Sequence, residues 1–164
     1  MADQSTKIYV PPKGTRGTRV MDFVFALMKP FAGREVKRYQ KADGPEPKLF
    51  MGFPVLVLTT VGAKSGQERS TVLGGFPDGE NAWLIIASKG GSATHPGWFH
   101  NIAANPDKVW AQIGNRKFKV ECKSLTGKER EDAYNRVASI AKAYQSYPTK
   151  TDREIPVLRL TPAS

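Results

Sequence analysis

Two short segments of this sequence place a lysine, a hydroxyl side chain and glycine next to one another, each directly after an apolar run. Lys-Ser-Gly at residues 64–66 follows the run 55–61, and Ser-Lys-Gly-Gly at residues 88–91 follows the run 82–87. Such a turn offers positive charge, a hydrogen-bond donor and close backbone approach, which together suit a phosphate or a carboxylate. Two of them, each at a strand end, indicate one anionic ligand that lies across the edge of a sheet.

The first of these segments does not match a nucleoside-triphosphate-binding loop. The Walker pattern needs a glycine immediately before the lysine and a second glycine five residues before that one, where this sequence has Ala63 and Leu58. Arg69 lies five residues after the lysine and can add a bidentate clamp on an anion. The alternative interpretation of this segment is an ordinary basic hairpin turn.

The residues after the second segment combine an indole with an amide. Pro96 suits the first position of a short helix that runs to about Ala104, because it lacks the N–H that would be unpaired there. Trp98 and Asn101 are three residues apart and share one face of this helix. One can cover a planar heteroaromatic ring while the other bonds its edge, and the first N–H groups of the helix can face an anion. Core packing is the alternative for Trp98.

Tyr144 and Tyr147 lie three residues apart near the end of the last expected helix. A tyrosine with its ordinary pKa of about 10 is protonated at neutral pH and can donate a proton or bond a substrate carbonyl. The alternative is a packing pair at a helix end.

Other chemistries are poorly supported by the residue types present. His95 and His100 are the only two histidines and Cys122 is the only cysteine, so we expect no metal site and no intrachain disulfide. The sequence has no Gly-x-Ser-x-Gly elbow, and Ser88 has no evident histidine–carboxylate pair, which argues against a serine hydrolase.

Strands dominate the middle of the chain and are joined by short turns. We expect strands over 55–61, 68–76, 82–87, 109–113, 117–125 and 155–160. Pro156 favours an edge position for the last one, and Gly114-Asn115 predicts a two-residue hairpin. Thr126 with Glu129 predicts a capping box at the start of the late helix, whose apolar face would comprise Ala133, Val137, Ile140, Ala141 and Tyr144. No βαβ rhythm is present, so we expect an antiparallel barrel with peripheral helices.

The N-terminal third differs from the rest. Residues 1–18 are polar and rich in proline and glycine, which predicts a mobile arm. Residues 19–54 predict a basic amphipathic helix, ended or kinked near Pro30, and an extended connector, and residues 55–164 would form the barrel domain. The helical apolar stripe comprises Val20, Phe23, Val24, Leu27, Met28 and Phe31. It either docks on the core or, with the basic residues of segment 16–38, lies on an anionic membrane surface.

Composition limits the partners. The 164 residues carry 25 lysines and arginines against 15 acidic residues, a net charge of +10, which favours an anionic ligand or surface. The charge is spread along the chain, so we expect no nucleic-acid patch. We also expect no signal peptide and no membrane span. The expected location is the cytoplasm, where the protein could also contact the inner face of the membrane. A monomer or a weak homodimer is expected.

The segments LTTVGAKSGQERSTVL, IIASKGGSATHPGWFHNIAANP and YQSYPTKTDREIPV together resemble the deazaflavin-dependent nitroreductase family of actinobacteria. Members bind coenzyme F420 and include F420-dependent quinone reductases. The resemblance extends from about Val55 to Leu160. It implies a split β-barrel of the flavin-reductase and pyridoxamine-oxidase type, and reduced F420 as hydride donor. The implied substrates are quinones, activated alkenes such as enones and coumarin-like lactones, and in some members nitroaromatics.

The resemblance also implies roles for single residues. The segment 64–73 would hold the phosphate and lactyl-glutamate tail, the segment 86–89 would line the deazaflavin, and the helix after Pro96 would complete the pocket. The cofactor-binding residues are then Lys64, Ser65, Gly66, Arg69, Ser70, Thr71, Val72, Leu73, Ile86, Ala87, Ser88, Lys89, Gly97, Trp98 and Asn101. The catalytic residues are Ser88, Tyr144 and Tyr147. A further tyrosine of the family falls on Ala141 here, which weakens the case for nitroimidazole activation.

Two other functions fit parts of the sequence. One is an FMN-binding reductase with the same barrel, and the other is a non-enzymatic basic protein that binds an anionic membrane or nucleic acid. A nucleic-acid binder would need aromatic and basic side chains interleaved on an open surface and would lose affinity steeply with salt.

Overall fold

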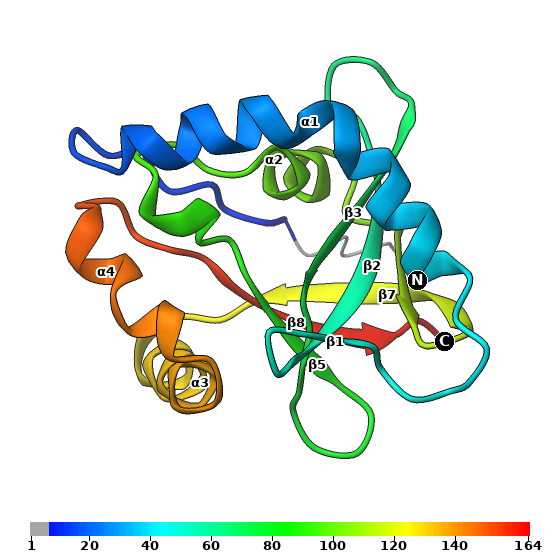
Figure 1. The fold of residues 1–164 in the computed structure, drawn as a ribbon. Coiled ribbons are helices and arrows are strands. Elements are labelled where there is room, and N and C mark those ends of the chain that lie inside the picture. Colours follow the sequence, from blue (N-terminus) through cyan, green and yellow to red (C-terminus); the bar gives the residue numbers. More distant parts are fainter. Residues whose placement is uncertain (1–6) are drawn as a thin grey trace.

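An antiparallel β-sheet forms the centre of the molecule (Figure 1). The computed structural model describes residues 7–164. Its strands are paired in the order β1-β2-β6-β7-β8-β5-β4, and β3 also pairs with β2. The bounds are β1 Leu49–Phe50, β2 Phe53–Val61, β3 Glu68–Gly74, β4 Phe76–Pro77, β5 Trp83–Ile86, β6 Val109–Ile113, β7 Arg116–Ser124 and β8 Val157–Pro162. The expected fold, a split β-barrel with peripheral helices, is confirmed.

Strand β7 belongs to both halves of the barrel. Its residues 116–119 pair with β6, and its residues 120–124 pair with β8. Strand β8 lies between β7 and β5, so the edge position predicted from Pro156 is wrong. Pro156 precedes the strand, and its carbonyl accepts a hydrogen bond from the Ala87 N–H at 2.9 Å. Because a carbonyl is all that the sheet requires of this residue, the missing N–H costs nothing here.

Two of the expected hairpins form as predicted. Strands β2 and β3 pair from Val55↔Gly74 to Val61↔Glu68, on either side of the turn 62–67. Strands β6 and β7 meet at Ile113↔Arg116, across a two-residue turn in which Gly114 has a φ of 55°. A glycine suits that turn because its left-handed backbone would strain most other residues.

Two apolar clusters hold the barrel together. The first fills its interior between β2, β5, β6 and helix α2 (Gly97–Ala104), and its fully buried members include Leu58, Ile85, Phe99 and Ile102. The second lies between β5, β8 and helix α3 (Gly127–Ile140). The loop that follows β5 leaves the sheet where both clusters meet, since Ile86 belongs to the second cluster and Ala87 to the first.

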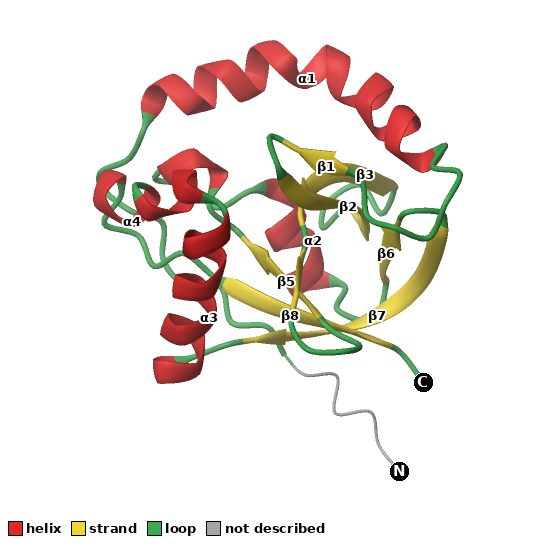
Figure 2. Ribbon diagram, turned by 60° about the horizontal axis from the view of Figure 1, so that its bottom comes forward, coloured by secondary structure: helices red, strands yellow, loops and turns green. Residues whose placement is uncertain are grey.

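Helix α1 (Arg19–Gln40) is longer than expected and continues through Pro30. Figure 2 shows it as an arch over the barrel. A proline inside a helix removes one backbone hydrogen bond and bends the axis. Here every residue from Phe23 to Glu35 is exposed, so water can satisfy the carbonyl that the proline leaves without a partner.

The apolar stripe of α1 faces away from the barrel. Asp22 and Val36 contact the body of the protein and lie within about 40° of each other around the helix, whereas Phe31 lies about 180° from Asp22. The stripe residues are 39 to 69% exposed. The core-docking interpretation of this stripe is therefore wrong: α1 docks through another face and leaves its hydrophobic side chains in solvent.

The segment before α1 also differs from its prediction. Residues 1–6 of the expected mobile arm lie outside the described residues. From Lys7 onward the segment packs on the barrel. Ile8 is 5% exposed and belongs to the interior cluster, the Gly14 N–H donates to the Ala93 carbonyl at 2.8 Å, and the Thr15 N–H donates to Asp152 at 2.9 Å. One apolar side chain and a few loop contacts are enough to fix a polar segment, and composition alone does not reveal them.

The late helical region is divided where one continuous helix was expected. Helix α3 ends at Ile140, and Ala141 is extended (φ −116°, ψ 93°). A 3-10 turn, η2 (Lys142–Gln145), and a short helix, α4 (Tyr147–Lys150), follow. Thr126 is the N-cap of α3 but makes no side-chain capping bond, and the Glu129 carboxylate pairs with Lys123 and Arg159, so the predicted capping box does not form. Four residues of the predicted apolar face are buried as expected: Ala133, Val137, Ala141 and Tyr144. Ile140 is exposed, contrary to prediction, and Tyr134 and Ala138 are buried in addition.

Candidate active site

The β2–β3 turn presents its predicted anion-binding residues to solvent. Lys64, Ser65 and Gly66 are all exposed. The Gly66 N–H donates to the Gly62 carbonyl at 2.9 Å, and Ser65 Oγ accepts a hydrogen bond from the Gln67 N–H at 3.2 Å. Gly66 has a φ of 67° and no heavy atom within 4 Å of the position a Cβ would occupy. A ligand can therefore reach the backbone of this turn closely.

Helix α2 is tied to this turn through Asn101. Its Oδ1 accepts a hydrogen bond from the Ala63 N–H at 3.0 Å, and its Nδ2 donates to Thr60 Oγ1 at 3.1 Å. Both polar groups of the amide are thus engaged within the protein. The helix begins at Gly97, one residue later than expected, with Pro96 as its extended N-cap, and Trp98 is half-buried against the interior cluster. Asn101 positions the turn, in addition to the cofactor contact that the sequence predicts for it.

The predicted residues of β3 divide between the two faces of the sheet. Cross-strand partners lie on one face, so Arg69, Thr71 and Leu73 share a face with Thr60, Leu58 and Leu56, and Ser70 and Val72 share the opposite face with Thr59 and Val57. Ser70 Oγ lies 2.8 Å from Thr59 Oγ1. The five side chains therefore cannot all contact one ligand, although backbone N–H groups of the strand remain available to it.

The loop after β5 has an unusual backbone. Three successive residues, Lys89, Gly90 and Gly91, have φ values of 44°, 61° and 83°. This conformation is strained for a lysine and easy for glycine. Ser88, which precedes them, is buried, and its Oγ makes no hydrogen bond with another residue of the described part of the chain. The loop thus carries one free hydroxyl next to a lysine held in a left-handed conformation.

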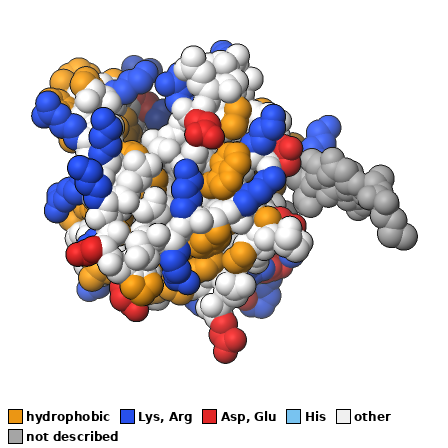
Figure 3. All heavy atoms as spheres, turned by 90° about the vertical axis from the view of Figure 1, so that its right-hand side faces the viewer, with side chains coloured by type: hydrophobic (Ala, Val, Ile, Leu, Met, Phe, Trp, Pro, Cys, Tyr) orange, Lys and Arg blue, Asp and Glu red, His pale blue; other side chains and the backbone are white. Residues whose placement is uncertain are grey.

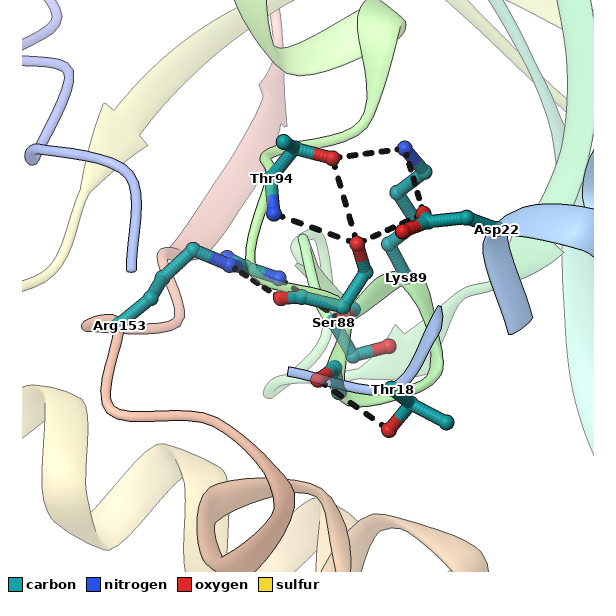
Figure 4. A network of polar contacts seen from close by, with 8 residues as sticks. Thr18, Asp22, Ser88, Lys89, Thr94 and Arg153 are labelled. Carbon is teal, nitrogen blue, oxygen red and sulfur yellow. Dashed lines mark hydrogen bonds and ion pairs between the residues drawn. The ribbon is translucent and has the colours of Figure 1, made fainter. Parts of the chain in front are cut away.

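The ammonium of Lys89 is occupied by groups of the protein itself (Figure 4). Its Nζ lies 3.1 Å from Asp22 Oδ1 of α1 and donates to Thr94 Oγ1 at 2.9 Å. Ser92 Oγ donates to the same Asp22 oxygen at 2.7 Å. The hydrogen bond from Ser92, followed by the charge of Lys89, holds the pKa of Asp22 below its ordinary value against a partial desolvation. Asp22 is therefore a carboxylate at neutral pH.

Beneath the same loop lies a buried arginine. Arg153 is 5% exposed and donates to the carbonyls of Ala87, Ser88 and Ser92 at 2.8 to 3.0 Å. Burial lowers its pKa to about 10, so it is charged at neutral pH. Figure 4 shows its side chain reaching into the loop from the opposite side to Lys89.

The two candidate tyrosines form an edge-to-face pair. Their ring centroids are 5.1 Å apart, with the planes at 68°. Tyr144 is buried and packs edge-on against Phe53 and Phe76, whereas Tyr147 is half-buried. Desolvation raises the pKa of both phenols, more strongly for Tyr144. Both hydroxyls are thus protonated at neutral pH and can donate a hydrogen bond.

Direct contacts join these parts into one region. Asn101 connects the β2–β3 turn with α2, which follows the 88–94 loop. Gly91 in that loop packs against Lys150 of α4, because a Cβ on Gly91 would lie 2.8 Å from the Lys150 Cβ. At the far end of β3, a Cβ on Gly74 would lie 2.9 Å from the Tyr144 hydroxyl. These contacts link the β2–β3 turn to α2, the 88–94 loop to α4, and β3 to Tyr144.

Sequence reasoning missed two residues of this region. Asp22 was part of the predicted helix, but no pattern indicates that it pairs with Lys89, 67 positions later. Arg153 lies in the family-like segment TDREIP, yet its contacts with Ala87 and Ser88 depend entirely on the fold. The only signal in the sequence was the presence of a charged residue: Asp22 within an apolar helical stripe, and Arg153 within a family motif.

Other parts of the surface offer less. A hollow of about 240 Å³ lies between Ile8, Tyr9, Lys123 and Leu125, and none of the predicted cofactor residues lines it. Among residues 7–164 no three histidine, cysteine or acidic side chains gather in a way that could hold a metal ion. Within the same residues, no helix combines the length and apolarity needed to span a bilayer. Lysine and arginine side chains are interspersed with hydrophobic ones on the face in Figure 3.

Comparison with known protein families gives a match over most of the chain. A family model described as F420H(2)-dependent quinone reductase matches residues 32–162. The F420H(2)-dependent quinone reductase Rv1261c of Mycobacterium tuberculosis (strain H37Rv) is 42% identical over 113 residues, which cover 66% of this chain and 73% of that protein. The residues matched by the family model include both lysine-bearing turns, α2, Tyr144 and Tyr147.

Two solved structures are similar in both sequence and fold. An F420-H2 dependent reductase, FDR-A, has a TM-score of 0.59 and 37% sequence identity, and covers 65% of this chain and 93% of its own. A second structure, described as a domain-swapped dimer, has a TM-score of 0.61 and 31% identity, and covers 84% of this chain and 98% of its own.

Proposed function

This chain belongs to the F420H(2)-dependent quinone reductase family, and from that premise we propose that it binds reduced F420 along the side of the barrel described above and reduces a quinone there. It is an oxidoreductase whose hydride donor is reduced F420. The observation that supports the proposed site is the contact of α2 with the β2–β3 turn through Asn101, together with the lysine-bearing loop 88–94 that leads into α2.

The residues present fit this cofactor. F420 carries a phosphate and a carboxylate-rich tail, and the exposed Lys64 and Arg69 offer a point charge and a planar fork for such anions. Gly66 and Gly97 both have open space where a Cβ would be, so the backbone of the turn and the start of α2 are accessible to a ligand. Lys89 is the exception, because it reaches an anion only if Asp22 yields.

Two hydroxyl groups in this region can provide hydrogen-bond donors. Bound reduced F420 supplies the hydride, and the negative charge that results on the quinone needs a donor nearby. We assign that role to the hydroxyls of Ser88 and Tyr147. The raised pKa of Tyr147 keeps its proton available, and a donor aimed at a developing oxyanion lowers the barrier by about 3–4 kcal/mol. Enones and related activated alkenes develop the same charge and form a second substrate class.

We also propose that α1 brings the protein to an anionic membrane, where lipid quinones are dissolved. The stripe of α1 is exposed on the side away from the barrel, and five basic residues against two acidic ones give the helix Arg19–Gln40 a net charge of +3. Apolar surface combined with positive charge suits anionic lipid. A second copy of a chain with net charge +10 would bring like charges together. A cytoplasmic location at the inner face of the membrane is part of this proposal.

Fluorescence titration of F420 against the purified protein, beside FMN and at two salt concentrations, tests the cofactor. We expect saturable, F420-selective binding, with Lys64→Ala and Arg69→Ala each raising the Kd. Binding of FMN instead would keep the fold but replace the cofactor, and binding of neither would make the proposed site wrong. Stopped-flow oxidation of reduced F420 by a soluble naphthoquinone then tests the reaction.

A further inference from the structure

We infer that Arg153 is a positioning residue that braces the 88–92 loop in the conformation that presents Ser88 and Lys89 to the cofactor. The effect on cofactor binding rests on the proposed function, whereas the bracing of the loop rests on the contacts of Arg153. Arg153 follows the last residue of the loop, Ser92, by 61 positions in sequence and is buried.

The hydrogen bonds of Arg153 are nearly all directed at one loop. Its Nε donates to the Ser92 carbonyl at 2.9 Å, Nη1 donates to the Ala87 carbonyl at 3.0 Å, and Nη2 donates to the Ser88 carbonyl at 2.8 Å. Nη1 also lies 3.0 Å from His95 Nδ1. The guanidinium thus uses four of its five N–H groups on segment 87–95, immediately before and within the expected cofactor loop.

The partners of this buried cation are unusual. A buried charge is normally paired with an opposite charge, yet within the described residues the hydrogen bonds of the Arg153 guanidinium go to carbonyls and an imidazole. Arg130, which also donates to a backbone carbonyl, that of Ile155, lies 3.7 Å from Glu154. Neutral carbonyls compensate a guanidinium only when several converge on it. The carbonyls of the loop therefore compensate the charge of the Arg153 guanidinium, which pairs with no carboxylate of the described residues.

The conformation of the loop explains why a brace is needed. Lys89 has a φ of 44° and is followed by two glycines with positive φ. Strained backbone persists only where its surroundings fix it from several sides, and Arg153 holds the carbonyls on both sides of Lys89. The N–H groups of Gly91 and Ser92 then close the turn onto the Ser88 and Lys89 carbonyls at 2.9 and 3.1 Å.

A guanidinium is required because of its shape. Its planar fork fixes three carbonyls in one geometry, whereas an ammonium has a point charge and cannot span them. The conservative Arg153→Lys variant should therefore keep the charge and part of the packing but lose the simultaneous bonds to Ala87, Ser88 and Ser92.

Amide hydrogen exchange and cofactor binding test the two halves of the inference. In ligand-free protein, exchange of the peptide that contains Gly91 and Ser92 should be at least tenfold faster in Arg153→Lys than in wild type. The Kd for F420, from fluorescence, should rise about tenfold, with KM for reduced F420 raised and kcat for a soluble naphthoquinone within about threefold. Arg153→Met should show a larger Kd, so that lysine partly rescues binding. Arg130→Lys is the matched control and should leave both loop exchange and Kd within twofold of wild type.

The outcomes separate this inference from the proposed function. Unchanged loop exchange in Arg153→Lys, or an unchanged Kd in spite of faster exchange, would overturn the positioning role. An equal effect of Arg130→Lys would assign the result to general destabilisation and overturn it too. If the wild type binds no F420, the proposed function and the cofactor half of the inference are wrong, while the exchange experiment still decides whether Arg153 braces the loop. If Arg153→Met does not fold, the comparison of Arg153→Lys with Arg130→Lys decides.

Discussion

The ammonium nitrogen of Lys89 lies 3.1 Å from Oδ1 of Asp22, so helix α1 places a carboxylate on a lysine assigned to the cofactor. Met21, beside Asp22, packs where a Cβ on Gly90 would lie, and Thr18 N donates to the Gly91 carbonyl at 3.0 Å. The start of α1 is thus attached to the 88–92 loop. Under the proposed function, an anionic cofactor group that binds Lys89 would compete with Asp22, which would couple the position of α1 to cofactor binding.

Removal of the Asp22 charge should tighten cofactor binding. In Asp22→Asn the amide can still accept a hydrogen bond from Ser92, but Lys89 is released for the cofactor. A partly exposed pair of this kind contributes roughly 0.5–1 kcal/mol, so the Kd for F420 should fall about two- to fivefold. Fluorescence titration at low and high salt measures this change.

Glu35→Gln provides the control, because it removes the same charge from the same helix at an exposed position. It should leave the Kd unchanged. A higher Kd in Asp22→Asn would show that Asp22 orients Lys89 for the cofactor and does not compete with it.

His95 makes the stability of the protein depend on pH near neutrality. Its ring nitrogens lie 2.7 Å from the Pro11 carbonyl and 3.0 Å from Arg153, so the neutral imidazole with its proton on Nε2 satisfies both. Burial is the main cause that lowers its pKa from the ordinary value of 6.5, and the charges of Arg153 and His100 add to it. The unfolded chain therefore binds this proton more tightly than the folded one.

The sign of this effect follows from linkage. The stabilisation is present above about pH 6.5 and is lost as pH falls below it toward the folded pKa, with a slope of at most about 1.4 kcal/mol per pH unit. The carboxyl groups of Asp22, Asp152 and Glu129 have pKa values lowered from their ordinary values, so they titrate at lower pH than this histidine. Urea unfolding between pH 5 and 8 should show the loss in wild type and a flatter profile in His95→Gln. A flat wild-type profile, or an equally steep profile in His95→Gln, would contradict the assignment.

Asn101 should contribute to stability through both of its hydrogen bonds. Asn101→Ala leaves the buried Thr60 hydroxyl and the Ala63 N–H without their partner, which costs roughly 1–3 kcal/mol. Asn105→Ala removes one bond, to the Val61 carbonyl, and should cost less. Urea midpoints measure both, and equal losses would mean that the bonds of Asn101 are not specially important.

The two tyrosines should separate in kinetics. Tyr147 is the more accessible, so Tyr147→Phe should lower kcat on the order of 10²-fold with the Kd for F420 within twofold. The Tyr144 hydroxyl lies against the Gly74 backbone, and Tyr144→Phe should change kcat by less than about threefold. Rapid-mixing kinetics with a soluble naphthoquinone distinguishes them. The reverse order would move the proton donor to Tyr144, and no effect of either would leave Ser88 or water.

Much of the barrel is encoded locally, and for that reason it could be predicted. The β-branched run before Gly62, the turn at Gly114 and the start of α2 after Pro96 depend on neighbouring residues, and they form close to their expected bounds. The resemblance in three motifs added the cofactor. The division of the Arg69–Leu73 side chains between two faces of the sheet also follows from strand alternation. The prediction that all five residues contact the cofactor did not take this alternation into account.

Long-range pairing explains what the sequence could not reveal. Pro156 indicates an edge strand because it lacks an N–H for the sheet. It lies just before β8, however, so β8 can pair on both sides. The stripe of α1 reads as a core-facing surface, because a pattern of apolar residues shows amphipathicity and not the direction it faces. Arg153 and Asp22 act on Ser88 and Lys89 only after the chain has folded, and no local periodicity marks them.

The outward stripe of α1 gives the last prediction. If the stripe binds anionic lipid, the wild type should cosediment with vesicles of phosphatidylglycerol and not with neutral phosphatidylcholine, and high salt should weaken the binding. The double variant Leu27→Glu/Phe31→Glu places two charges in the exposed stripe, so it should lose vesicle binding and keep its unfolding midpoint. Met51→Glu, at the 85% exposed tip beside β1, adds one charge off the helix and should bind like wild type. Light scattering tests the competing occupant, a second copy of the chain. A wild-type dimer that does not bind vesicles and that dissociates in the double variant would assign the stripe to this second copy.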